Sequence, residues 1–161
     1  MNSAVDASLT ERAALGRAVG WAWTALAASL GLHVADEAVH GFLPIWNATV
    51  LAIRESSPWL PLPVFRYDIW LAGLIAGVLA MLAVIPAVRA GVPWTRTAAW
   101  ALALIMIGNA MGHTVGTIFG RTVDTVVFAR PMPGFLSSPF LLAASLCLLW
   151  TLRCEKRCAA R

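Results

Sequence analysis

The sequence has little charge, which excludes most soluble folds. Only 12% of its 161 residues are Asp, Glu, Lys or Arg, and 60% are hydrophobic, against about 25% and about 45–50% in an ordinary soluble domain. The formal net charge is +4, but the basic residues are scattered and form no stripe interleaved with aromatic residues. We therefore expect no nucleic-acid partner.

Several familiar catalytic signatures are also missing. The chain has no Walker loop, no nucleotide-binding glycine fingerprint, no CxxC pair and no Gly-x-Ser-x-Gly elbow. Its three cysteines, Cys147, Cys154 and Cys158, all fall close to the C-terminus. We expect them to be reduced thiols rather than a disulfide framework. Their shared helical face leaves palmitoylation as an alternative.

Four long uncharged stretches predict the fold. They cover residues 18–35, 69–88, 97–120 and 131–152, each close to the roughly 17–25 residues that span a bilayer. We predict one all-α membrane domain over residues 1–161, a four-transmembrane-helix bundle with helices at about 18–41, 69–88, 97–120 and 135–152. Residues 43–68 contain four prolines and two tryptophans and should lie on the external membrane surface, with Pro44 ending or kinking the first helix.

The Lys and Arg residues predict the orientation. Eight of the twelve fall in the N-terminal tail, between the second and third predicted helices, and at the C-terminus. The other four fall between the first and second helices and between the third and fourth. Because cytoplasmic segments retain positive charge, we expect both termini in the cytoplasm of a multi-pass protein, in a bacterial inner membrane. A cleaved signal peptide over residues 1–30 is the alternative, although no convincing small-residue cleavage site follows.

Tryptophan and glycine add two further predictions. The eight tryptophans fall near the ends of the predicted helices, which favours two interfacial belts. The third predicted helix carries a glycine at every fourth position: Gly108, Gly112, Gly116 and Gly120. Such a row lets helices approach closely. It predicts either a homo-oligomer interface or, as we favour, packing within the bundle.

The candidate site comes from two helices. His33, Glu37 and His40 share one face of the first helix, with Asp36 at its flank. Asn109, His113 and Thr117 form a similar row on the third. Counted from the cytoplasmic arginines at about 1.5 Å per residue, His33 and His113 lie at about 24 and 25 Å. If these parallel helices touch, their side chains converge in the outer leaflet.

This residue set favours metal binding. Imidazoles and carboxylates are common ligands of zinc, iron and manganese, so we predict a divalent metal held by His33, Glu37, His40 and His113. Glu37 and Asp36 are the candidate catalytic carboxylates, and Asn109 and Thr117 would contact the substrate or orient the ligands. Two alternatives stay open: metal-free acid–base chemistry, and hydrated or salt-bridged side chains without a functional role.

The same residues resemble a known family. His33, Asp36 and Glu37 form a His-x-x-Asp-Glu run, followed by Pro44 and Trp46, and Asn109 and His113 form an Asn-x-x-x-His in a later helix. This pattern is similar to the HXXEE family of small multispanning membrane proteins, which have no settled activity. The resemblance implies a membrane domain with a polar site of metal-binding character. Asp36 replaces the family's first glutamate, which shortens the reach by one methylene.

Several functions remain compatible with the sequence, which does not decide whether the protein is an enzyme. The first is a metal-binding membrane protein that acts on a lipid or other amphiphile. The second is a metal-free lipid-binding or isomerase-like protein, similar in design to four-helix sterol isomerases. A small proton-coupled transporter is the third, although its site should lie nearer the midplane. A purely structural subunit is the fourth.

Overall fold

The computed structural model describes residues 2–159 and is mostly helical. Six helices and a short hairpin follow one another along the chain: α1 (Asn2–His40), α2 (Phe42–Ser56), α3 (Tyr67–Ala83), α4 (Ile85–Arg89), α5 (Pro93–Phe119), β1 (Arg121–Val123), β2 (Val126–Val127) and α6 (Ser138–Ala159). β1 and β2 pair antiparallel. The helical class predicted from the sequence is confirmed.

Three segments are long and apolar enough to cross a membrane. They are Gly16–His40 within α1, Tyr67–Arg89 across α3 and α4, and Pro93–Phe119, which is α5. Tyr67–Arg89 has the highest mean hydropathy, 2.5. These three correspond to the first three predicted spans.

The fourth predicted helix begins later than expected, at Ser138 rather than near residue 135. Pro139 suits the first turn of a helix because its missing N–H needs no partner there. Only 15 uncharged residues precede Arg153, a length of about 22 Å. The apolar run before Ser138 is a loop instead of helix. Cys147 and Cys154 on α6 are free thiols, and the Cys158 side chain lies outside the described residues.

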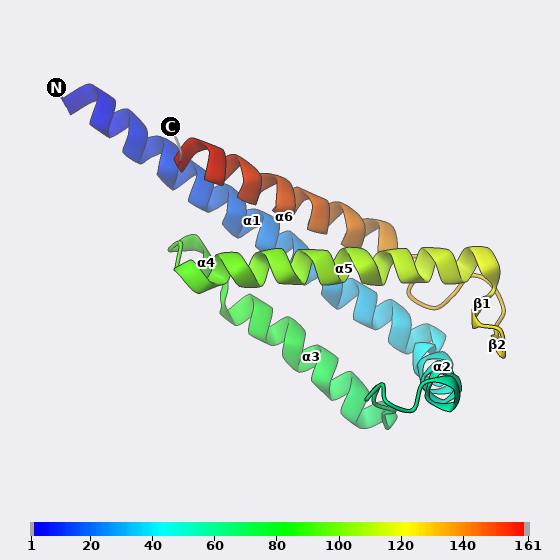
Figure 1. The fold of residues 1–161 in the computed structure, drawn as a ribbon. Coiled ribbons are helices and arrows are strands. Elements are labelled where there is room, and N and C mark those ends of the chain that lie inside the picture. The colour runs from blue at the N-terminus through cyan, green and yellow to red at the C-terminus, as the bar shows by residue number, and fades with distance from the viewer. Residues whose placement is uncertain (1, 160–161) are drawn as a thin grey trace.

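The helices pack around α6, which lies against both α1 and α5 (Figure 1). α1 also packs on α3 and α4. The core includes fully or nearly buried residues of α1, α5 and α6: Trp23, Leu26, Ala27, Ala99, Ala103, Leu141, Leu148 and Leu152. Alanine at two core positions of α5 lets that helix approach α6 closely.

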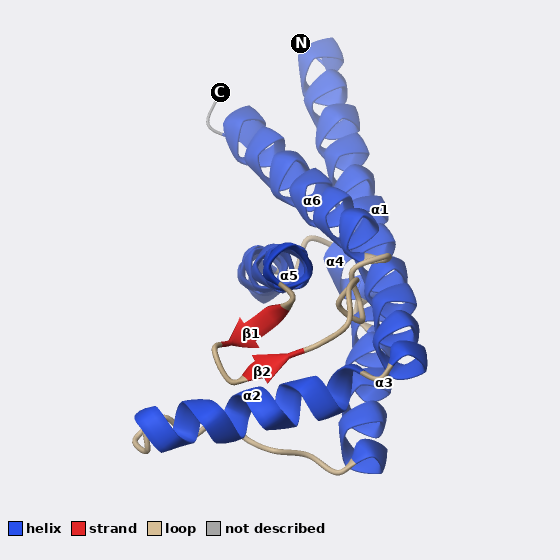
Figure 2. Cartoon of the chain, turned by 90° about the vertical axis from the view of Figure 1, so that its right-hand side faces the viewer, coloured by secondary structure: helices blue, strands red, loops and turns tan. Residues whose placement is uncertain are grey.

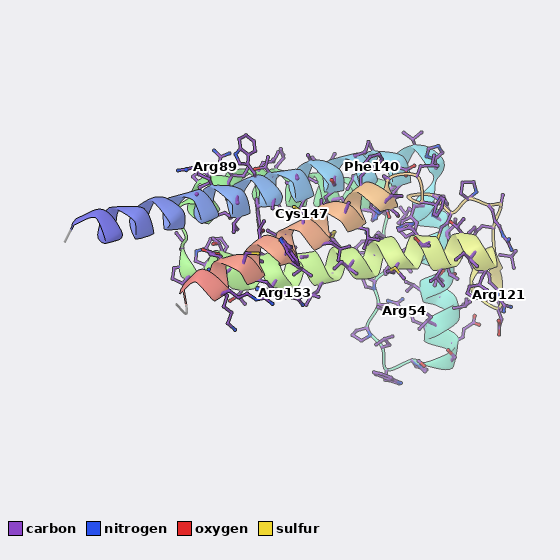
Figure 3. The ribbon with its side chains drawn as sticks, turned by 90° about the horizontal axis from the view of Figure 1, so that it is seen from above. Arg54, Arg89, Arg121, Phe140, Cys147 and Arg153 are labelled. Atoms are coloured by element: carbon purple, nitrogen blue, oxygen red, sulfur yellow. The ribbon has the colours of Figure 1, made fainter. Side chains whose placement is uncertain are left out.

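Both termini lie at one end of the molecule, and α2 and the hairpin lie at the other (Figure 1). Arg89 and Arg153 are found toward the end with the termini, whereas Arg54 and Arg121 lie toward the opposite end (Figure 3). These four arginines therefore lie at two opposite ends of the molecule.

The predicted interfacial segment contains a helix of its own. α2 lies crosswise to α1 and α3 (Figure 2). The prediction that Pro44 ends or kinks the first helix is wrong, because α1 already ends at His40, before Gly41 with its left-handed φ of 77°. Pro44 sits in the first turn of α2. Asn47 ties α2 to the following loop through its Nδ2, 2.9 Å from the Phe65 carbonyl, and its Oδ1, 3.0 Å from the Phe65 N–H.

The tryptophan prediction needs correction at two positions. Trp21, Trp94, Trp150 and Trp59 are more than half exposed, and their place in an interfacial belt stays a prediction. Trp23 and Trp70 are instead buried. The Trp23 indole N–H donates to the Met81 carbonyl at 2.8 Å and joins α1 to α3.

The glycine row also packs differently from the prediction. A Cβ added at Gly108 or Gly112 would meet no atom within 4 Å, so no neighbouring helix of the described chain packs there. Gly116 faces Met132 in the loop before α6, and Gly120 ends α5 with a φ of 67°. Packing within the bundle is therefore wrong for the first two glycines.

Candidate metal centre

Three ionisable side chains from α1 and α5 meet in the interior. His33, Glu37 and His113 are 0%, 5% and 2% exposed, and each offers a ligand atom within 4.8 Å of the other two. Glu37 Oε1 lies 3.5 Å from His33 Nε2 and 3.0 Å from His113 Nε2. The two helices predicted to build one site thus do so, although each packs mainly against α6 rather than against the other.

Aromatic packing and a glycine fix the imidazole rings. The rings of His33 and His113 meet edge to face, with centroids 4.7 Å apart, and the Phe42 ring centroid lies 5.0 Å from that of His113. Gly134 closes the cluster from the loop before α6. Its φ is 89°, and an added Cβ would lie 2.6 Å from His113 Cε1 and 3.0 Å from His33 Cε1. This position therefore requires glycine.

Ser137 connects the cluster to Asp36. The Ser137 hydroxyl lies 2.7 Å from Asp36 Oδ2 and 2.8 Å from His33 Nδ1, and the Ser137 backbone N–H donates to the same carboxylate oxygen at 2.9 Å. A carboxylate only accepts hydrogen bonds, so the hydroxyl donates to Asp36 and accepts from His33 Nδ1–H. This assignment leaves the Nε2 lone pair of His33 directed toward the cluster.

The two separations between Glu37 Oε1 and the histidine nitrogens fit a divalent cation. Two ligands bound at about 2.0–2.1 Å in tetrahedral geometry lie about 3.3 Å apart, and the observed separations from Glu37 Oε1 are 3.5 and 3.0 Å. A histidine ligand normally donates its other ring N–H to a protein group, as His33 does to Ser137. Three protein ligands would leave one coordination position open, as in catalytic zinc sites.

The hydrogen bonding of the cluster would have to change for a metal ion to bind. Asn109 Nδ2 lies 3.2 Å from His33 Nε2 and occupies the lone pair that a cation would need. His113 Nδ1 is buried and has no hydrogen-bond partner among the described residues. Without a metal, the cluster is a set of hydrogen bonds in which His113 Nε2–H donates to Glu37 and Asn109 donates to His33.

The remaining predicted site residues lie outside the three-residue group. His40 has a 52% exposed side chain, and its Nδ1 lies 2.7 Å from Asp36 Oδ1. At seven residues from His33 it sits about 10 Å farther along the helix axis, too far to share a ligand position. Asp36 is held by Ser137 and His40 instead of entering the cluster. Thr117 accepts a hydrogen bond from the Met132 N–H at 3.0 Å and holds the loop.

Ser137, Gly134 and Phe42 are the site residues that sequence reasoning missed. The Ser-Ser-Pro run before α6 marks a helix start, but it gives no sign that Ser137 contacts a residue 104 positions away. Comparison with protein-family models, curated proteins and solved structures gives no match. The geometry of His33, Glu37 and His113 is therefore the main guide to function.

Proposed function

We propose that the protein is a multi-pass membrane protein that binds a divalent metal ion through His33, Glu37 and His113 and acts on a membrane lipid or other amphiphile. The observation that carries this proposal is the convergence of three buried ligand atoms within 4.8 Å. Zinc, iron and manganese all accept such mixed imidazole and carboxylate ligands.

The membrane arrangement follows from the apolar helices and the basic residues. α6 serves as the fourth crossing helix beside the three apolar spans. The N-terminal tail, the connection before α5 and the C-terminal segment hold eight of the twelve Lys and Arg residues of the sequence, so the end with both termini would face the cytoplasm by the positive-inside rule. His33 and His113 then lie in the outer half of the bilayer. Multi-pass insertion in a bacterial inner membrane accounts for both features.

Energetics support a functional origin for the cluster. An ionisable side chain inside a membrane costs at least about 2.5 kcal/mol at the helix centre and marks a functional site by default. A bound cation would supply Lewis acidity toward an ester or phosphoryl oxygen. Asp36 and Ser137 would hold the His33 ring, and Asn109 would turn from His33 Nε2 toward the substrate. The motif resemblance to the HXXEE proteins stays a prediction.

Elemental analysis of detergent-purified protein tests the proposal. Wild type should contain about one metal per chain after loading with zinc, iron or manganese, and His113→Ala should contain none. His40→Ala is the matched control, because His40 is exposed and lies outside the group. Size-exclusion chromatography and circular dichroism verify that each variant folds. Metal-free wild type, or equal loss in His40→Ala, would overturn the proposal.

A metal-free acid–base protein is the second candidate. The contact between His113 Nε2 and Glu37 Oε1 favours it, since a 3.0 Å separation already suits proton exchange. The Asn109 contact with His33 also completes the cluster without an ion. This candidate predicts that lipid binding or turnover persists after dialysis against a chelator.

A further inference from the structure

Two cavities adjoin the cluster, and both are walled in part by α2. The first has a volume of about 370 Å³ and extends along α5, where its lining includes Gly108, Gly112, His113 and Arg121. The second has a volume of about 350 Å³, lies against α3 and reaches Glu37. Phe42, Trp46 and Asn109 line both. Aromatic walls with a few polar groups are typical of small-molecule sites.

The first cavity has distinct apolar and polar parts. Its apolar part lies along Gly108 and Gly112, two exposed positions where an added Cβ would meet nothing within 4 Å. His113, which is 2% exposed and has an unpartnered Nδ1, lines the middle. Arg121 and Thr122 line the part beyond the end of α5, toward the α2 end of the molecule (Figure 3). The lining therefore passes from the apolar glycine positions to the His113 imidazole and then to the cationic Arg121.

This order matches a lipid held in its membrane orientation. We propose that the first cavity binds one acyl chain of an anionic membrane lipid, with its headgroup at Arg121, its tail over Gly108 and Gly112, and its head-to-tail linkage beside His113. From Gly108 to Phe119, the last residue of α5, the helix rises about 16 Å, room for part of one tail below a headgroup at Arg121. The inference extends the proposed function by naming the substrate class of the same site.

Arg121 is available to an anionic headgroup. Its guanidinium lies 2.9 Å from Asp124, whose side chain is 90% exposed. An ion pair this exposed contributes little, so a lipid phosphate can replace it. A charge-assisted contact to phosphate is the arrangement for which arginine is best suited.

The charge of the lining favours an anionic lipid over a second copy of the protein. The lining includes Arg121 and, among the described residues, no acidic residue, and α2 walls the cavity with Phe42 and Trp46. An anionic amphiphile therefore complements both its charge and its apolar surface.

Native mass spectrometry with added dioleoyl phosphatidylglycerol or dioleoyl phosphatidylcholine tests the inference. Wild type should retain about one phosphatidylglycerol, and Gly112→Leu and Gly108→Leu should each reduce retention at least tenfold by filling the cavity. Gly77→Leu is the matched control, since this helical glycine also meets nothing within 4 Å but lines neither cavity. Arg121→Gln should weaken phosphatidylglycerol binding about tenfold, as expected for losing a hydrogen bond to a charged group.

Two readouts separate this inference from the metal site. Chelated wild type should still retain the lipid, so a failure of metal binding leaves the cavity proposal standing. Gly108→Leu lies more than one turn from His113 and should keep the metal content of wild type. Wild-type lipid retention in both cavity variants overturns the inference. A dimer that the two substitutions dissociate also overturns it, since a second copy would then be the occupant.

Discussion

Replacing Ser137 by alanine isolates the contribution of one buried hydroxyl to the metal site. Ser137 is 3% exposed and bridges Asp36 and His33 with contacts of 2.7 and 2.8 Å. Its removal leaves His33 Nδ1–H without a partner in a fully buried position. An unsatisfied buried polar group costs about 1–3 kcal/mol, and loss of a group that orients a histidine ligand lowers metal affinity about 10–100-fold.

Ser138→Ala provides the control for this experiment. Ser138 is equally buried at 2%, and its hydroxyl donates to the Gly134 carbonyl at 2.7 Å. After the substitution the Gly134 carbonyl still accepts a hydrogen bond from the Ser138 backbone N–H at 3.1 Å. Ser138→Ala should therefore lower the free energy of unfolding by only about 0.5–1.5 kcal/mol. It should leave metal affinity unchanged.

Competition with a chromogenic chelator measures zinc affinity in detergent, and ¹⁵N spectra of the imidazoles report the ring tautomer. Ser137→Ala should weaken zinc binding about 10–100-fold and remove the Nδ1–H preference of His33. Ser137→Thr keeps the hydroxyl and should restore part of both. If Ser137→Ala binds zinc within twofold of Ser138→Ala, Ser137 does not orient the ligand.

Three further substitutions test the surrounding structure. Gly134→Ala should abolish metal binding and lower the melting temperature more than Gly41→Ala. Both glycines have positive φ, but only Gly134 also faces the two imidazoles. Equal effects of the two substitutions in thermal and metal-binding assays would show that backbone strain alone matters. Trp23→Phe should lower the unfolding free energy by about 0.5–3 kcal/mol, since it leaves the buried Met81 carbonyl without the indole donor, and an unchanged melting curve would refute that. Asn109→Ala should not weaken zinc binding, because it frees His33 Nε2; a large loss in chelator competition would make Asn109 a supporting residue.

The sequence predicted the site better than it predicted the packing. Counting residues from Arg17 and Arg96 placed His33 and His113 at one depth, and the structure brings these rings together. The count works because helical rise is constant along a helix. The face of a helix is a weaker guide to which residues share a site. His33 and His40 lie on one face of α1, but the rise between them separates them along the helix axis.

Contacts made by loops were beyond sequence reasoning. The loop before α6 brings Gly134 and Ser137 to the cluster, and no local pattern encodes which distant residue a loop will meet. The glycine row shows the same limit. Its four-residue period indicates a smooth helix face, but not whether a helix, a loop or a cavity lies against it.

X-ray absorption spectroscopy of the zinc-loaded protein tests the central claim most directly, because it counts the ligands around the ion. We predict two imidazole nitrogens at about 2.0–2.1 Å and one carboxylate oxygen at about 2.0–2.2 Å, with the same ligand set in zinc-loaded His40→Ala. A spectrum with three imidazoles, or with none, would contradict a site built from His33, Glu37 and His113.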